Sequence, residues 1–286
     1  MEITKYDLGL GTTYERLSLN DYLCRLAETL GINSVLEGPF DGMKGIAGIN
    51  SLIFGKHGVK TTTMLPDQKA IELAKLVWDK EGCLKQAAFI CNPDNHLTLQ
   101  ESGFDLVWNF ACLPHMTDYK ATLNEMICAS KKYVLVFVSN RINYGFWIHY
   151  LLHKVTGEAW NHGNIYLMNI GLIERHLKSQ GLHIIEKPFV DVPWWPDLDL
   201  PIGDILSSFM PFLKKQLQQT NHAQHYKWGI ENLPYFAPNE EMDGIMKRHG
   251  VVEQSNIPLI KYIFAHHQGI LAEKCENISG KEDVDC

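Results

Sequence analysis

The sequence contains no CxxC pair, no long apolar run and no excess of basic side chains. Its seven cysteines stand singly along 286 residues, so we expect neither a zinc ribbon nor a thioredoxin-like site, and their odd number indicates free thiols in a reducing cytosol. The formal net charge of −7 disfavours a broad nucleic-acid-binding surface. A transmembrane helix needs roughly 18 consecutive apolar residues, and the first residues lack the basic and apolar parts of a signal peptide. We therefore expect a cytoplasmic protein without a transmembrane segment.

Two nucleotide-binding fingerprints are also missing. The stretch 35–50, VLEGPFDGMKGIAGIN, spaces its glycines as DGxxGxxG instead of GxGxxG, and no GKS or GKT occurs. A carboxylate such as that of Glu37, at the tip of a strand, repels a pyrophosphate and attracts an ammonium group. The stretch therefore favours a ligand with a cationic amino-acid end and no phosphates, such as S-adenosylmethionine. The alternative is that Glu37 only accepts hydrogen bonds from the backbone of its own loop.

The hydrophobic pattern alternates between the period of a strand and the period of a helix. This alternation is typical of βαβ units and predicts an α/β fold, a doubly wound and mostly parallel sheet of seven strands with helices on both faces. The predicted strands are 32–38, 59–65, 86–92, 104–111, 133–140, 182–190 and 260–274, and the predicted helices are 15–31, 45–58, 66–82, 119–132 and 170–181.

Residues 193–258 differ in composition from the rest, because they are rich in tryptophan, tyrosine and proline. We expect them to form a lid inserted before the last strand. Residues 204–219 have apolar side chains at helical spacing with two lysines beside them, which predicts a lid helix packed on the core; contact with a membrane surface is the alternative. The predicted domains are an N-terminal helical segment (1–33), a Rossmann-like cofactor-binding domain (34–192 plus 259–275), the lid or substrate insertion (193–258) and a flexible tail (276–286).

Five segments resemble, in the right order, motifs of the class I S-adenosylmethionine-dependent methyltransferases. They are SVLEGPFDG, TTTMLPDQKAIELAK, FDLVWNFACLPHM, MNIGLIERHLKSQGLHIIEKPFVDVP and YIFAHHQGILAEK. The resemblance covers about residues 30–192 and 260–274. It implies S-adenosyl-L-methionine as the cofactor and in-line methyl transfer to a small-molecule acceptor. The net negative charge leads us to expect no nucleic acid as a partner. The oligomeric state is not indicated.

The sequence departs from this family at two positions. Pro39 stands where the first loop glycine is usual, and Leu65 stands where an acid usually binds the ribose. Either Asp67 replaces that acid or the ribose is held in another way. These departures keep open an S-adenosylmethionine-binding module without catalysis, or with a regulatory role; a nicotinamide-dependent oxidoreductase fits the glycine spacing less well.

The resemblance also assigns candidate site residues. Asp94 is expected near the adenine, or it only forms an Asx turn after Pro93. His115 and His162 are candidate general bases, or each only hydrogen-bonds its loop. His149 and His153 are four residues apart, but no third ligand is evident, so we expect no metal site. The expected cofactor-binding residues are Glu37, Gly38, Pro39, Asp41, Gly42, Leu65, Asp67, Asp94, Asn109, Phe110 and Ala111, and the expected substrate-binding residues are Asn140, Arg141, Tyr144, Trp147 and Trp160.

Overall fold

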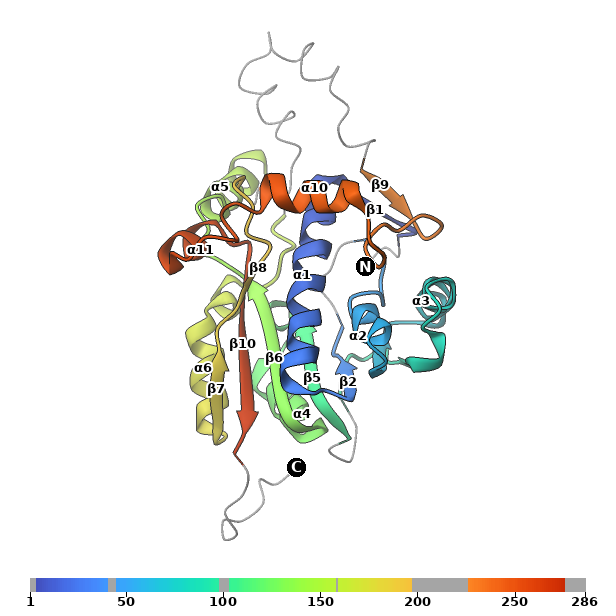
Figure 1. Ribbon diagram of the computed structural model, residues 1–286. Coiled ribbons are helices and arrows are strands. Elements are labelled where there is room, and N and C mark those ends of the chain that lie inside the picture. Colours follow the sequence, from blue (N-terminus) through green and yellow to red (C-terminus); the bar gives the residue numbers. More distant parts are fainter. Residues whose placement is uncertain (1–3, 41–44, 98–102, 158, 197–225, 276–286) are drawn as a thin grey trace.

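The computed structural model describes residues 4–40, 45–97, 103–157, 159–196 and 226–275 (Figure 1). Its main sheet has the strand order β4-β3-β2-β5-β6-β10-β7, and the short strand β8 pairs with β10. The ladders among β4, β3, β2, β5 and β6 are parallel, whereas β10 runs antiparallel to its neighbours. The predicted doubly wound, mostly parallel α/β sheet is thereby confirmed. The strands are β2 (Ser34–Glu37), β3 (Lys60–Leu65), β4 (Ala87–Cys91), β5 (Phe104–Phe110), β6 (Ser130–Ser139), β7 (Leu182–Glu186), β8 (Phe189–Val190) and β10 (His267–Lys274).

Helices cover both faces of this sheet (Figure 1). Apolar side chains of α1 pack with Trp108 and Phe110 of β5 on one face, and α4 and α6 pack with Val107 on the other. The side chains of β5 thus alternate between the two faces, as the period of two in a strand requires. The helices are α1 (Gly9–Leu30), α2 (Leu52–Lys56), α3 (Gln68–Lys80), α4 (Tyr119–Ala129), α5 (Phe146–Thr156), α6 (Ile170–Ser179), α10 (Glu240–His249) and α11 (Pro258–Phe264), with 3-10 turns η1 (Leu84–Gln86), η2 (Leu113–His115) and η3 (Ile165–Met168).

Three sequence predictions need correction. The predicted strand 260–274 begins as helix α11, and β10 starts only at His267. The predicted helix 45–58 is reduced to α2, because Gly45 and Gly48 have φ angles of +91° and +77°, outside the right-handed helical region. The predicted strand 182–190 is divided into β7 and β8 around Pro188, which lacks a backbone N–H for the ladder.

A second, two-stranded sheet joins distant parts of the chain. Strand β1 (Tyr6–Leu8) pairs antiparallel with β9 (Lys227–Gly229), and α1 begins directly after β1. Helix α10 and this small sheet lie beyond the end of the main sheet toward which β6 points (Figure 1). The N-terminal segment and the region after residue 225 therefore build one end of the molecule together. The predicted lid helix 204–219 and the tail 276–286 lie outside the described residues.

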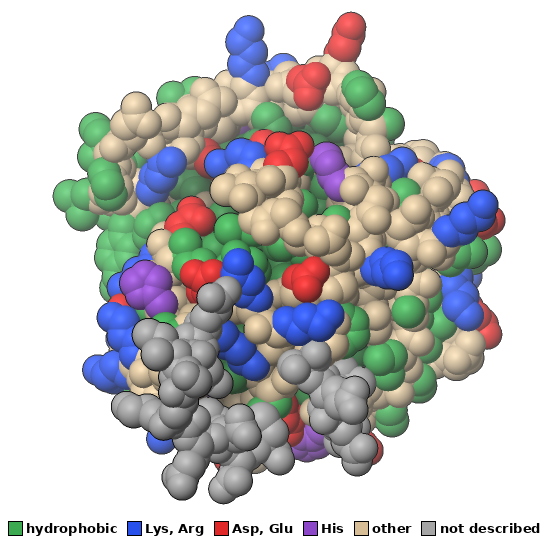
Figure 2. Space-filling view, turned by 60° about the horizontal axis from the view of Figure 1, so that its bottom comes forward, with side chains coloured by type: hydrophobic (Ala, Val, Ile, Leu, Met, Phe, Trp, Pro, Cys, Tyr) green, Lys and Arg blue, Asp and Glu red, His purple; other side chains and the backbone are tan. Residues whose placement is uncertain are grey.

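The opposite end of the molecule carries acidic and basic side chains interspersed on one surface (Figure 2). Within the described residues, no helix combines the length and the apolar character that a membrane crossing requires.

Candidate functional site

A small cleft lies at the carboxyl ends of β2, β3 and β5. Ligands of doubly wound sheets bind beyond this edge, so the cleft is the candidate site. Its interior volume is about 30 Å³. It is lined by Glu37, Pro39, Phe40, Ile46, Ala47, Gly48, Asn50, Met64, Leu65 and Phe110.

Glu37 ends β2 and is buried at the base of this cleft. Its carboxylate accepts hydrogen bonds from the Asn50 side-chain amide at 3.0 Å and from the Ser51 backbone N–H at 3.2 Å. Burial raises the pKa of Glu37, and the hydrogen bonds from Ser51 and Asn50 oppose this shift. Both observed partners belong to the loop after β2, as the alternative interpretation of Glu37 predicts, and the carboxylate also lines the cleft.

A buried ion pair extends this network to the N-terminal segment. The Arg16 guanidinium donates to both carboxylate oxygens of Asp7, at 3.0 Å and 3.4 Å, and to the Ile46 carbonyl at 2.9 Å. It also donates to the side-chain oxygen of Asn50. The sequence analysis did not find Asp7, Arg16 or Asn50, because only tertiary folding brings them to Glu37.

The glycines of the loop after β2 serve this packing. A Cβ atom on Gly45 would lie 2.1 Å from a carboxylate oxygen of Asp7. The Asp7 side chain can therefore occupy its position only because residue 45 is glycine. A Cβ atom on Gly48 would lie 2.8 Å from the Cβ of Ala74 and 3.1 Å from a methyl carbon of Leu65. Asp41 and Gly42, which belong to the same predicted motif, lie outside the described residues.

The other predicted cofactor residues occupy different positions around the cleft. Leu65 and Phe110 line it, whereas the Asp67 carboxylate caps α3 by accepting from the Ala70 N–H at 2.8 Å. Asp94 is exposed in a turn after β4. Its neighbour Asn95, which the sequence analysis did not single out, accepts a hydrogen bond from the Phe40 N–H at 2.8 Å and so ties that turn to the cleft.

Residues predicted at the end of β5 point in different directions. Phe110 faces the α1 side and contacts the ring of His267, with ring centroids 4.5 Å apart. Asn109 is buried, and its side-chain amide lies 3.1 Å from the Met126 sulfur of α4. Ala111 has a φ angle of +54° where the chain leaves the strand, and His115 is exposed at the end of η2.

The predicted substrate residues after β6 form a separate group. The Asn140 amide is buried and donates to the carbonyls of Tyr262 and Ala265, which ties the end of β6 to α11. The Tyr144 hydroxyl donates to the Trp194 carbonyl at 2.9 Å. Arg141 is half-buried, and Trp147 is exposed on α5.

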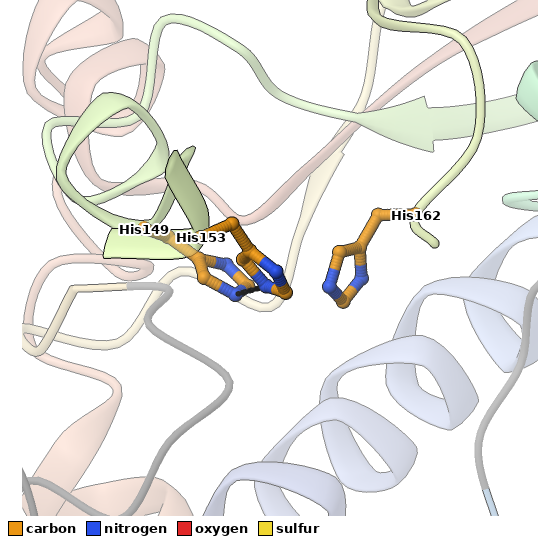
Figure 3. Close-up of side chains that lie close together, drawn as sticks. All are labelled: His149, His153 and His162. Carbon is orange, nitrogen blue, oxygen red and sulfur yellow. Dashed lines mark hydrogen bonds between the residues drawn. The ribbon is translucent and has the colours of Figure 1, made fainter. Parts of the chain in front are cut away.

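Three imidazoles lie together beside this group, from His149 and His153 of α5 and from His162 of the following loop (Figure 3). The Nε2 atoms of His149 and His153 are 3.0 Å apart, and the His162 ring lies 4.8 Å and 5.3 Å from theirs, measured between centroids. The indole of Trp160 packs against all three rings. The structure therefore brings together two predicted site residues, Trp160 and His162, with the histidine pair that lacked a third partner in the sequence.

A second polar cluster lies where β10 begins. His266 Nδ1 lies 2.9 Å from a carboxylate oxygen of Asp191, and its Nε2 lies 3.1 Å from the Trp195 carbonyl oxygen. Burial lowers the pKa of the adjacent His267 to about 4. His267 is therefore neutral near pH 7, and its 3.8 Å contacts with Glu15 and Asp191 are not ion pairs.

The comparisons with known proteins bear on the fold. No family model and no curated protein matches this sequence. Magnesium protoporphyrin IX methyltransferase (ChlM) from Synechocystis PCC 6803, crystallised with bound SAH, matches with a TM-score of 0.51 and 13% identity, over 65% of this chain and 82% of that chain.

Two further solved structures align over more of the chain but with lower scores. A Galdieria sulphuraria protein described as a sarcosine dimethylglycine methyltransferase has a TM-score of 0.49 and 10% identity, over 89% of this chain and 84% of that chain. The YcgJ protein from Bacillus subtilis has a TM-score of 0.48 and 13% identity, over 91% of this chain and 99% of that chain. At such identities a likeness concerns the fold alone. The strand order and the match to ChlM show that this chain has the fold of the class I S-adenosylmethionine-dependent methyltransferases, the family that its sequence motifs resemble.

Proposed function

We propose that this protein is an S-adenosylmethionine-dependent methyltransferase that acts on a small molecule. The observation that carries the proposal is the cleft beside Glu37, because it lies at the ligand-binding edge of a methyltransferase fold. ChlM, which shares the fold, was crystallised with SAH.

The residues around the cleft fit this cofactor in their chemistry. Glu37 offers a buried carboxylate for the ammonium group, and Phe40, Leu65 and Phe110 offer apolar walls for an adenine ring. A cation beside Glu37 would also offset the burial that raises the pKa of this carboxyl group. Gly48 lies close to Leu65 and, because it has no side chain, contributes only backbone atoms to the lining of the cleft beside Leu65.

The volume of about 30 Å³ is far below that of an adenosyl compound, so the proposal requires the lining side chains to move on binding. Met64 is the best candidate, because its unbranched side chain adapts readily. The backbone of Phe40 is hydrogen-bonded to the Asn95 side chain.

The bound cofactor would supply a methyl group on a positively charged sulfur. The task of the chain is then to align the acceptor and to exclude water, which apolar walls achieve. His115, at the end of η2 and five residues after Phe110, is our candidate base for an acceptor that must lose a proton. The acceptor would enter between the end of β6 and the predicted insertion 193–258, where Tyr144 already contacts Trp194.

A module that binds S-adenosylmethionine without catalysis is the second candidate. One observation favours it: the Asp67 carboxylate is engaged as the cap of α3, and Leu65 gives no acid to bind a ribose. Binding of the cofactor without any transfer of its methyl group to an acceptor would support this module over the enzyme.

Equilibrium dialysis with S-adenosylmethionine carrying a tritium-labelled methyl group tests the proposal. The wild-type protein should bind it, and Glu37→Gln should weaken binding by about tenfold or more, because a charged hydrogen-bonded contact contributes about 1.5–3 kcal/mol. The control is Glu72→Gln, an exposed carboxylate of α3, which should bind as the wild type does. Incubation with a small-molecule cell extract should then move label to an acceptor. Binding of NAD instead of S-adenosylmethionine would refute the proposal.

A further inference from the structure

Two histidines of α5 present their ring nitrogens to one another. His149 and His153 are one helical turn apart, and residues at this spacing share a face of the helix. Their Nε2 atoms are 3.0 Å apart. His149 is buried and His153 is half-buried, so the pair points inward rather than into open solvent (Figure 3).

A third imidazole completes the group from outside the helix. His162 faces the pair from the loop after α5, and one ligating nitrogen of each ring lies within 4.8 Å of the other two (Figure 3). In tetrahedral zinc sites the metal–nitrogen distance is about 2.0–2.1 Å, which places two ligand nitrogens about 3.4 Å apart. Metal binding would therefore require the His149 and His153 nitrogens to separate slightly from 3.0 Å and any pair now as far as 4.8 Å apart to move closer.

The loop that carries His162 is held in place by two hydrogen bonds and by a close approach of Gly163 to Pro114. The Asn164 N–H donates to the Pro114 carbonyl at 2.7 Å, and the Trp160 indole N–H donates to the Gly163 carbonyl at 2.8 Å. Gly163 has a φ angle of +84°, and a Cβ atom there would lie 2.7 Å from Pro114. Residue 163 must therefore be glycine for the loop to approach η2 this closely.

One aromatic side chain packs against all three rings. The Trp160 indole lies 5.7 Å, 5.4 Å and 4.7 Å from the rings of His149, His153 and His162, and it also contacts Phe146 and Tyr150. An apolar shell of this kind limits solvent access and fixes the orientation of metal ligands. A hydrogen bond between His149 and His153 accounts for the 3.0 Å contact of that pair, but it gives no reason for a third imidazole to converge on the same point.

We propose that His149, His153 and His162 form a binding site for a divalent transition metal ion, with Zn²⁺ as the preferred ion. Imidazole nitrogen suits zinc, copper, iron and nickel, and the absence of a carboxylate among these three ligands makes the site unlike the two-histidine, one-carboxylate centres of iron enzymes. Three protein ligands leave the fourth tetrahedral position open to water or to an oxygen or nitrogen atom of another ligand.

Titration of the chelator-treated full-length protein with Co²⁺ alone tests this site. We expect one equivalent to bind with the strong visible absorption of four-coordinate cobalt, and Zn²⁺ to displace it. His162→Asn and His153→Asn should each weaken binding by at least about 100-fold, because even the groups that merely orient metal ligands account for 10–100-fold in affinity. His183→Asn, at an exposed position of β7, is the matched control and should bind normally.

Two other groups could compete for the ion. Glu15, Asp191 and His267 form one, and Cys24, Glu28 and His57 form the other, with the Cys24 sulfur 3.1 Å from the His57 ring. Cobalt held by the second of these would show sulfur-to-metal charge transfer, and Cys24→Ser would abolish it.

Binding that survives His153→Asn unchanged, or no stoichiometric binding by the folded wild-type protein, would overturn the proposal. His153 is half-buried on a helix, so its variant decides the matter even if His162→Asn does not fold. No methyl donor is needed, so the outcome is independent of the proposed methyl transfer.

Discussion

Around Glu37, acidic side chains are paired with basic side chains or with hydrogen-bond donors of the same chain. At the three histidines, by contrast, side chains of one kind lie close together. Asp7, Arg16, Asn50 and Glu37 form a continuous chain of hydrogen bonds and charge pairs behind the cleft. The imidazoles of α5 and its loop instead pack against the indole of Trp160. The first region pairs its charges within the chain, while the second is arranged by its loop to receive a cation.

The largest predicted effect comes from breaking the charge compensation beside the cleft. Arg16→Met would leave the fully buried Asp7 carboxylate without its cation, and we expect a loss of about 3–5 kcal/mol in the free energy of unfolding. Urea denaturation measures this loss. The control Arg25→Met removes an exposed pair with Asp21 and should change stability by less than about 1 kcal/mol.

The double variant Arg16→Met with Asp7→Asn sharpens the result. Because it removes both charges, it should recover part of the stability that Arg16→Met loses. If the single variant is no less stable than Arg25→Met, the description of this region as charge-compensated is wrong.

The next effect concerns His267, which contacts the cleft residue Phe110. Its pKa is about 4 in the folded protein against 6.5 in the unfolded chain, so the unfolded state binds the proton more readily. The contribution of this histidine to stability is fully present above pH 6.5 and is lost as the pH falls through 4. About 1.4 kcal/mol per pKa unit gives a total of about 3 kcal/mol.

The pH dependence of the free energy of unfolding, compared between wild type and His267→Gln, measures this contribution. The wild type should lose more stability than the variant between pH 6.5 and pH 4. The two curves must be compared because other groups also change stability in this pH range. Burial raises the pKa of Glu37 and Glu253, and these raised pKa values favour the folded state at low pH in both proteins. His183→Gln, an exposed control, should follow the wild type. Parallel curves for His267→Gln and wild type would contradict the prediction.

The smallest predicted effect tests how firmly the loop of His162 is held. Gly163→Ala combines a positive φ with a Cβ atom 2.7 Å from Pro114, and we expect a loss of about 2–3 kcal/mol. Gly58→Ala is the matched control, because its φ is +77° but nothing lies within 4 Å, so about 1 kcal/mol should be lost. Urea denaturation of both variants gives the comparison, and equal losses would mean that the contact with Pro114 does not hold the loop.

The same contrast explains what the sequence could and could not predict. The strand that ends at Glu37 and the doubly wound, mostly parallel sheet follow from local patterns and from the family motifs, and both are confirmed. The pairing of Asp7 with Arg16 could not be predicted, because periodicity indicates which face is buried and does not identify a partner across space. Likewise His149 and His153 were visible as a pair, but only the folded loop brings His162 to them.

Local signals also misled where backbone conformation decided the outcome. Apolar spacing in 45–58 suggested a long helix, although its glycines adopt positive φ angles to admit Asp7 and to pack on Ala74. In 260–274 the apolar run gave no sign of the change from α11 to β10 near Ala265. The cofactor and substrate contacts of the individual site residues stay predictions.

The pairing of β1 with β9 has a consequence for how the protein is made. Asp7 is the middle residue of β1, and residues 227–229 leave the ribosome only when most of the 286-residue chain has been synthesised. The nascent chain can build the early strands of the sheet before then, but the small sheet that anchors Asp7 cannot form. Translation that stops short of β9 would release a chain in which the Asp7 carboxylate is not held beside Arg16. Cellular quality control would then encounter an incompletely folded fragment.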